Sequence, residues 1–394
     1  MKKILILLFF ACFHICFGQK QTLFLDTNYD AAIAQSKKEN KPLALMFYTK
    51  WCSHCNKMKS EVFVDSEVIN FYSSNYICVA VDAESTIGGT LKNKLQNKFL
   101  VKSYPTFAFI DSNENLLICM AGEFKKEVFI QEGQKALLPD NQFNVIKDRF
   151  NADNSNSENC LRYIIAYRKA GFDATEVTQK YLKTKKDSEL FTELNWKILA
   201  NGINNLSAKE VSFISNKREE FAKVVGISRV EKKLIYMVSD NLKPLVEIGD
   251  TIQYNNKRPI AASLQIRKVD SLLFHYDLAI DEISSNWKNY KKNCEALTTK
   301  FAWNDSNTLV SICNNYLTHI DDKKNLDLAI SYAKQALLLG KSLDKYILVS
   351  NLYAKENDYT NAIAYINYGR TTAKDFGWKT EDLDKLLADF KKHL

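Results

Sequence analysis

The chain has 394 residues, of which 46% are hydrophobic and 12% aromatic, which is enough for packed cores and suggests two or three domains. The formal net charge is only +8, and the lysines are interspersed with acidic residues, which argues against a nucleic-acid-binding protein. With 12 glycines and 5 prolines, most of the chain is predicted to form regular helices and strands.

The first 18 residues have the pattern of a cleaved secretory signal peptide. Two lysines precede an apolar run over residues 4–17, and Gly18 precedes a polar start. Cleavage there lowers the formal charge from +8 to +6. A lipoprotein signal ending at Cys12 or Cys16 is the alternative. No later stretch has the roughly 18 apolar residues of a membrane helix, so we expect a soluble periplasmic or secreted protein, in a compartment where disulfides persist.

Residues 19–145 alternate between strand-like and helix-like hydrophobic patterns. The predicted order is strand 22–27, helix 28–41, strand 42–48, helix 52–63, strand 76–84, helix 90–101, a hairpin of strands 106–112 and 116–122, and helix 125–138. This order predicts an α/β fold in which a central mixed sheet is flanked by helices.

The rest of the chain is predicted to contain almost no strands. Residues 146–159 are interpreted as a linker, because 150–159 are rich in Asn and Ser. Residues 160–394 are predicted to form an α-helical domain ending in a capping helix at 379–393. Near 310–375 one group of residues recurs 33 positions later: Ala329, Tyr332 and Ala336 return as Ala362, Tyr365 and Gly369. This pattern resembles tetratricopeptide repeats, and because two repeats rarely suffice, further degenerate helix pairs are expected before residue 310.

Cys52 and Cys55 lie in "WCSHC", residues 51–55, directly after the apolar run at 42–48. The spacing fits a zinc site, an inert structural disulfide or a reversible redox pair. Zinc usually needs four ligands, whereas no second C-x-x-C is present and only His54 lies near the pair. A thiol at the start of a helix faces free N–H groups and the positive end of the helix dipole, which favour the thiolate. We therefore favour a redox pair in which Cys52 attacks a substrate and Cys55 resolves the mixed disulfide.

A second motif lies fifty residues further on, where Tyr104, Pro105 and Thr106 open a predicted strand. Together, "FYTKWCSHC", "SYPTFAFID" and Gly122 resemble the thioredoxin family over about residues 21–138. The variant they resemble is the thioredoxin domain of bacterial periplasmic disulfide reductases.

The resemblance implies roles for the residues around the pair. Pro105 is expected to be cis, to lie against the disulfide and, with Tyr104 and Thr106, to contact the substrate peptide. Trp51 is expected to shield the sulfurs. His54 is expected to stabilise the Cys52 thiolate, as the equivalent histidine does in protein disulfide isomerase; the alternative is an exposed polar residue with no such role.

Two positions depart from the family pattern. The carboxylate that most relatives carry six residues before the first cysteine is Met46 here, and the lysine that often pairs with it is Cys78. Cys55 is therefore expected to lack its usual base. The remaining cysteines are expected to be buried free thiols, with a bridge between the last two left open: Cys119, Cys160, Cys294 and Cys313.

The sequence therefore predicts an exported thiol-disulfide oxidoreductase with a thioredoxin fold followed by a helical-repeat domain. Its expected partners are protein thiols and disulfides, with a membrane reductase as electron donor and a peptide or protein bound by the helical domain. It is expected to use no cofactor or metal and to bind no nucleic acid. The alternative is a helical-repeat scaffold or peptide-binding protein whose thioredoxin-like domain is only weakly redox-active.

Overall fold

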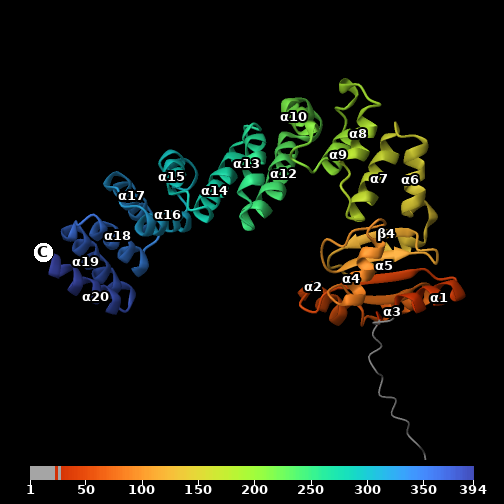
Figure 1. The fold of residues 1–394 in the computed structure, drawn as a ribbon, viewed down its shortest axis with the longest axis horizontal. Coiled ribbons are helices and arrows are strands. Elements are labelled where there is room, and N and C mark those ends of the chain that lie inside the picture. Colours follow the sequence, from red (N-terminus) through yellow and green to blue (C-terminus); the bar gives the residue numbers. More distant parts are fainter. Residues whose placement is uncertain (1–22, 25–27) are drawn as a thin grey trace, which may run out of the picture. The chain divides into compact units, whose positions relative to one another are not determined.

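The computed structural model describes residues 23–24 and 28–394. The predicted signal peptide and most of the predicted strand at 22–27 lie outside these residues. The chain divides into two compact units, one ending at Asn204 and the other running from Asn205 to Leu394 (Figure 1). Among the helices that are described, none combines the length and the apolar character needed to cross a membrane.

The first unit contains a four-stranded mixed sheet of order β2-β1-β3-β4. Strand β1 pairs with β2 in parallel and with β3 antiparallel, and β3 pairs with β4 antiparallel. The strands are β1 (Leu43–Tyr48), β2 (Ile77–Asp82), β3 (Thr106–Ile110) and β4 (Leu116–Ala121). The helices around them are α1 (Tyr29–Glu39), α2 (Ser53–Lys57), α3 (Ser66–Asn75), α4 (Thr86–Leu95) and α5 (Lys126–Leu137). The predicted α/β fold is confirmed.

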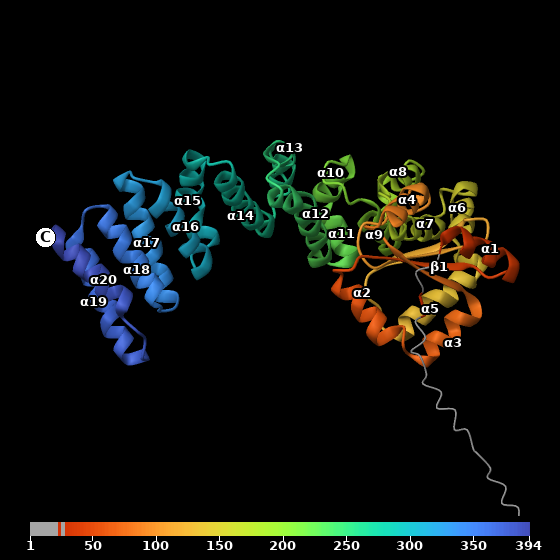
Figure 2. The ribbon, with the colours of Figure 1, turned by 60° about the horizontal axis from the view of Figure 1, so that its bottom comes forward.

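Strand β1 lies at the centre of the sheet, and all six of its residues are buried. Its side chains alternate between two apolar clusters, as the two-residue period of a strand requires. Ala44, Met46 and Tyr48 face the cluster formed with α2, α3 and α5. Leu43 and the other odd-numbered residues of β1 face the cluster formed with α1 and α4. Figure 2 shows α3 and α5 on one side of the strands and α4 on the other.

Helix α3 was not predicted from the sequence. Its N-terminus is capped by the side chain of Asp65, which accepts hydrogen bonds from the backbone N–H groups of the next turn. The hydroxyl of Tyr72 donates to the carbonyl of Phe129 at 2.7 Å, and that of Tyr76 donates to the carbonyl of Gly133 at 2.5 Å. These two bonds fasten α3 and the start of β2 to α5 within the apolar layer.

Two other helices differ from their predicted bounds. The predicted helix at 52–63 is divided into α2 and a π-helical turn at Met58–Val62. The helix predicted at 90–101 begins earlier, because the Ser85 side chain caps it by accepting from the N–H of Gly88.

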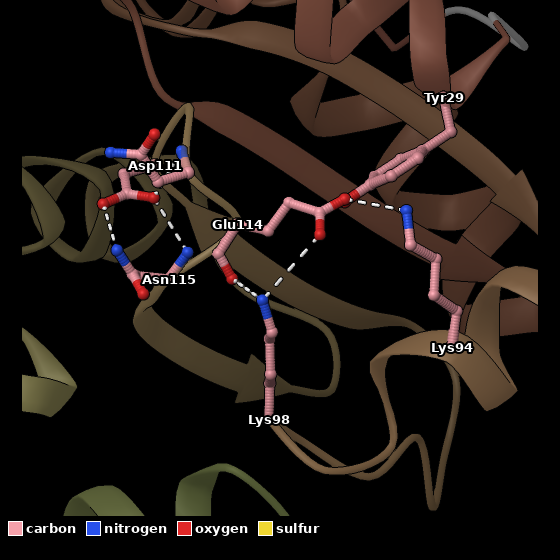
Figure 3. A network of polar contacts seen from close by, with 7 residues as sticks. Tyr29, Lys94, Lys98, Asp111, Glu114 and Asn115 are labelled. Atoms are coloured by element: carbon pink, nitrogen blue, oxygen red, sulfur yellow. Dashed lines mark hydrogen bonds and ion pairs between the residues drawn. The ribbon is translucent and has the colours of Figure 1, made fainter.

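The turn between β3 and β4 is held by the polar network in Figure 3. Glu114, whose φ of 62° is unusual for a residue other than glycine, accepts hydrogen bonds from the Tyr29 hydroxyl and from Lys94 Nζ, both at 2.8 Å. Lys98 donates to its carbonyl. The contact with Lys94 is the main cause that lowers the pKa of Glu114. One carboxylate thus links the hairpin to α1 and α4.

The segment predicted to be a linker is mostly helical, which corrects the sequence interpretation. It contains the second half of α6 (Phe143–Ala152) and the start of α7 (Ser157–Lys169), both of which pack against β4. The Asn156 side chain accepts from two backbone N–H groups of α7. Asn156 therefore caps the N-terminus of α7, and capping residues such as Asn are also the residues typical of linkers in a sequence.

Helix α7 is also bonded to the domain that precedes it. The N–H of Leu100 donates to the carbonyl of Ala170 at 2.7 Å, and Lys169 Nζ lies 3.0 Å from a carboxylate oxygen of Glu132 in α5. The first unit then continues through α8 (Thr175–Leu182) and α9 (Glu193–Gly202). The sheet and these helices accordingly belong to one compact unit.

The second unit is all α-helical, as predicted. Its helices are α10 (Lys209–Asn216), α11 (Arg218–Val225), α12 (Ile227–Glu247), α13 (Thr251–Ala262), α14 (Arg267–Ile283), α15 (Trp287–Phe301), α16 (Ser306–His319), α17 (Lys323–Leu339), α18 (Leu343–Lys355), α19 (Tyr359–Phe376) and α20 (Glu381–Phe390). Helices adjacent in sequence pack against each other (Figure 1).

Small residues allow close packing near the C-terminus, where a repeat was predicted. A Cβ atom on Gly369 would lie 3.0 Å from Cβ of Tyr346, and Ala362 is fully buried. Membership of the tetratricopeptide class stays a prediction. Cys294 and Cys313 are both free and buried, so the bridge left open between them is not formed.

We predict that Gly133→Ala destabilises the first unit by about 1–3 kcal/mol, because overpacking a filled core costs that much. An added Cβ would lie 2.7 Å from Cε1 of Phe71 and 2.8 Å from the Tyr72 hydroxyl. The matched control is Gly89→Ala in α4, where the nearest atom is 4.0 Å away. The control should gain roughly 0.5–1 kcal/mol of helix stability. The urea dependence of hydrogen exchange at the β1 amides measures the free energy of unfolding of each variant. Equal changes in the two variants would contradict the packing argument.

Candidate functional site

The turn that leads from β1 into α2 positions both cysteines of the C-x-x-C pair. After Tyr48, the N–H of Cys52 donates to the carbonyl of Thr49 at 3.3 Å, which closes the turn. Cys52 is the N-cap residue of α2, and its Sγ accepts a hydrogen bond from the N–H of Cys55 at 3.1 Å. A sulfur at this position faces the positive end of the helix dipole, as the sequence predicted.

The two cysteines form a disulfide whose Cα atoms are 5.3 Å apart. Cys52 is 4% exposed and Cys55 is fully buried, so Cys52 is the more exposed residue of the pair. Across residues 23–24 and 28–394, no group of three or more His, Cys, Asp or Glu side chains is arranged to hold a metal ion.

The loop containing Pro105 lies beside this turn. The Tyr104–Pro105 peptide bond is cis, as the resemblance implied. The indole of Trp51 is 70% exposed and meets the ring of Tyr104 edge to face, with centroids 6.2 Å apart. Trp51 Nε1 donates to Glu84 at 2.8 Å, which fixes the orientation of this exposed ring. The structure thus brings Trp51 and Tyr104 together at the surface.

The side chain of Thr106, a residue expected to contact the substrate, is turned into the domain. It is 1% exposed, and its hydroxyl donates to the carbonyl of Ser103 within the same loop at 2.7 Å. This side chain is therefore not available for a contact with a bound peptide. The carbonyl of Pro105 already accepts from the N–H of Gly122 at 2.8 Å, which ties the proline loop to the end of β4.

The residue after Gly122 is a part of the site that the sequence analysis missed. One carboxylate oxygen of Glu123 lies 2.9 Å from His54 Nδ1, and the other lies 2.5 Å from Lys57 Nζ. Both partners come from α2, and they lower the pKa of Glu123; the hydrogen bond with His54 is the largest single cause and the hydrogen bond with Lys57 is the next. The signal available in the sequence was an acidic residue directly after the Gly122 of the family pattern.

This contact changes the expected role of His54. Its side chain is 67% exposed, and its Nδ1 faces a carboxylate rather than a sulfur in the disulfide form. A carboxylate beside the imidazole offsets the positive charge that the resemblance assigned to the stabilisation of Cys52. Glu123 therefore opposes the stabilisation of the Cys52 thiolate that was expected of His54.

The inner side of the pair is apolar. Met46 is fully buried and pairs with Ala80 across β1 and β2, while Cys78 pairs with Ala44 on the same face of the sheet. Burial raises the pKa of the Cys78 thiol, so it is a poor proton acceptor near neutral pH. Within the described part of the chain, the N–H of Cys55 is the only hydrogen-bond donor to either sulfur.

Comparison with known proteins agrees with this geometry. Residues 29–137 match the model of a family described as a thioredoxin-like domain. Mouse protein disulfide-isomerase A5 is 31% identical over 111 residues, which are 28% of this chain and 20% of that protein. Thioredoxin-1 of Drosophila melanogaster is 30% identical over 78 residues, 20% of this chain and 64% of that protein. The chain thus spans less than two thirds of the length of these curated relatives.

Two solved structures are also similar. A putative disulphide-isomerase from Bacteroides thetaiotaomicron is 23% identical with a TM-score of 0.27, covering 29% of this chain and 93% of that one. A structure described as DsbH oxidoreductase is 23% identical with a TM-score of 0.25, covering 29% of this chain and 84% of that one. These scores are too low to add to the assignment. The matched family and the fold agree that residues 29–137 form a thioredoxin-like domain.

We predict that Glu123→Gln makes the Cys52–Cys55 disulfide more oxidising. Removing a negative charge beside Lys57 leaves the positive charge of this lysine uncompensated on α2, where it stabilises the Cys52 thiolate. The pH midpoint of thiolate formation in the reduced protein should fall by about half a unit, the size expected for a charge partly screened by water. Ultraviolet absorbance of the thiolate measures the midpoint, and equilibration with glutathione measures the potential.

Glu67→Gln is the control for that experiment. Glu67 carries the same charge on the same domain, is exposed, and pairs with Lys126 at 3.3 Å rather than with α2. Glu67→Gln should leave the pH midpoint of thiolate formation and the redox potential unchanged. A shift of equal size in the two variants would show that only the overall charge matters.

Proposed function

We propose that this chain is an exported thiol-disulfide oxidoreductase that acts on protein substrates through Cys52 and Cys55. The observation that carries the proposal is the placement of Cys52 at the N-cap of α2, where its sulfur accepts a backbone N–H bond beside the exposed Trp51. The same arrangement that stabilises the sulfur in the disulfide stabilises a thiolate after reduction.

The reaction is a pair of thiol-disulfide exchanges. The thiolate of reduced Cys52 attacks one sulfur of a substrate disulfide; the substrate S–S bond breaks, and the leaving sulfur takes a proton. Cys55 then loses its proton, and its sulfur attacks Cys52 Sγ, which breaks the mixed disulfide and releases the second substrate thiol. The substrate gains two electrons and two protons, and the protein returns to the Cys52–Cys55 disulfide. The reverse sequence oxidises a dithiol substrate.

The surrounding residues are proposed to support these steps. Trp51 and Tyr104 provide an aromatic surface for the substrate peptide, and the loop of Pro105 and Thr106 shapes the surface beside it. His54 adjusts the stability of the Cys52 thiolate within limits set by Glu123. None of these roles requires a cofactor beyond the two sulfurs.

Export and partners follow from the signal-peptide pattern of residues 1–18. A protein outside the cytoplasm has no access to cytoplasmic reductants, so a protein that reduces substrates there needs a membrane reductase as its electron donor. The names of the curated relatives, a protein disulfide-isomerase and a thioredoxin, fit substrates that are proteins with thiols or disulfides.

The second candidate is a helical scaffold with a redox-weak thioredoxin-like domain. The apolar surroundings of Cys55, with Met46 in place of a carboxylate, favour it. Turnover of insulin reduction by the full chain with dithiothreitol separates the candidates. The oxidoreductase should exceed the background rate several-fold, whereas the scaffold should match a folded Cys52→Ser/Cys55→Ser variant.

We predict that Cys52→Ser abolishes insulin reduction, whereas Cys55→Ser accumulates mixed disulfides with substrate. Attack requires the outer thiolate, and release requires the inner thiol. Non-reducing gels followed by mass spectrometry identify the trapped cysteine. Cys78→Ser serves as the control, because this thiol lies outside the pair and should leave turnover within about twofold. Loss of activity in both pair variants without a trapped complex would contradict the assigned roles.

We predict that Met46→Asp speeds resolution of the mixed disulfide above neutral pH, because it supplies a base on the inner side of Cys55. The buried charge should lower stability by several kcal/mol. Cys78→Lys in the same chain should recover part of that loss, since Cys78 lies on the same face of the sheet as Met46. Stopped-flow kinetics of a preformed mixed disulfide measure resolution; an unchanged rate in both folded variants would show that Cys55 is not short of a base.

A further inference from the structure

Three neighbouring helices of the second unit surround one polar cavity. Each helix contributes a pair of polar side chains four residues apart, which therefore lie on the same face of that helix. The pairs are Tyr254 and Arg258 from α13, Asp277 and Asp281 from α14, and Asn289 and Asn293 from α15; the exposed Asn255 and the apolar Ile280 also line the cavity. The cavity has a volume of about 220 Å³, several times the roughly 30 Å³ that one water occupies in the liquid.

One of the two carboxylates is already neutralised. Arg258 donates to Asp277 through Nε at 2.7 Å and through Nη2 at 2.6 Å, and the Tyr254 hydroxyl adds a bond of 2.6 Å. Asp277 is 6% exposed, so the carboxylate of this bidentate ion pair is buried. Its charge is balanced by the guanidinium, and its oxygens are occupied.

The other carboxylate has no cation of its own. Asp281 is 4% exposed, and its partners in the cavity wall are the amide nitrogens of Asn289, 2.9 Å from each oxygen, and of Asn293 at 2.9 Å. One guanidinium and two carboxylates leave the cavity with a formal charge of −1. Burial raises the pKa of Asp281, and the charge of Asp277 acts in the same direction while the amides and Arg258 oppose it.

The amide geometry determines what the cavity offers to a ligand. Because both asparagines turn their nitrogens toward Asp281, each keeps a carbonyl oxygen with no donor among the hydrogen bonds of residues 28–394. The remaining acceptors are thus Asp281 and two amide oxygens. Asn289 is exposed, so the cavity opens to solvent on the α15 side.

We propose that this cavity between α13, α14 and α15 binds a primary ammonium group. Such a group carries one positive charge and three N–H donors, which match the formal charge of −1 and the three acceptor groups, one carboxylate and two amide oxygens. A lysine side chain or the free N-terminus of a peptide would present this group. The site lies entirely in the second unit and is independent of the redox proposal.

The direct test uses the full chain and two simple salts. Isothermal titration with n-butylammonium chloride at constant ionic strength should show saturable binding of one equivalent. Tetramethylammonium chloride has the same charge but no N–H donor, and it should bind at least tenfold more weakly. Equal binding of the two salts would overturn the proposal, and so would the absence of saturation, which would assign the cavity to water.

Variants locate the binding. Asp281→Asn keeps the size of the side chain, removes the uncompensated charge, and should weaken butylammonium binding at least tenfold. Asn289→Ala changes an exposed side chain, keeps the buried residues intact, and should weaken binding several-fold even if the first variant folds poorly. Asp270→Asn removes the same charge from α14 outside the cavity and should bind like the unmodified chain. Unchanged binding in folded Asp281→Asn or in Asn289→Ala would exclude this cavity.

Two peptides identify the source of the ammonium. One has an acetylated N-terminus and an internal lysine; the other has a free N-terminus and no lysine. Tighter binding of the first assigns a lysine side chain, and tighter binding of the second assigns a chain terminus. Butylammonium binding with neither peptide would assign a small free amine as the occupant.

Discussion

Burial of β1 on both faces is the constraint on which the first unit depends. A strand with six buried residues and partners on both edges cannot shift its register without exposing one apolar set to water. The end of β1 is therefore fixed, and the turn after Tyr48 must place Cys52 at the first position from which a helix can begin. The location of the candidate site is in this sense a consequence of the core, and the chemistry of the sulfur follows from its place at a helix N-terminus.

The two sides of the Cys52–Cys55 pair differ in polarity: the outer side carries charged groups and the inner side is apolar. On the outer side, His54, Lys57 and Glu123 form a charged group in contact with water, where small changes in pairing change the stability of a thiolate. On the inner side, Met46 has no group that takes a proton, and the raised pKa of Cys78 keeps that thiol protonated near neutral pH. This asymmetry favours attack by Cys52 over deprotonation of Cys55, so the slow step of the proposed reaction lies in resolving the mixed disulfide.

The sequence was sufficient for the features that rest on local pattern. Apolar runs located the strands, and the paired motifs around Cys52 and Pro105 located the site, because both are short-range signals. Contacts between residues far apart in the sequence could not be predicted. No local pattern indicates that Glu123 contacts His54, which lies 69 positions earlier in the chain. The linker prediction was wrong for a different reason: Asn156 caps α7, but in the sequence it stands among Asn and Ser residues whose composition is that of a flexible segment.

The buried polar groups of the helical unit raise a separate question of why they are retained. A buried ion pair is often no more stabilising than apolar side chains of the same volume, so stability alone does not account for Asp277 and Arg258 between α13 and α14. Asp281 makes the argument stronger, because a buried carboxylate held only by amides carries a desolvation cost without a compensating cation. A well-packed apolar residue would relieve that cost if packing were its only role. Binding of a positively charged ligand would offset the desolvation cost of Asp281, and this role accounts for a carboxylate at a buried position.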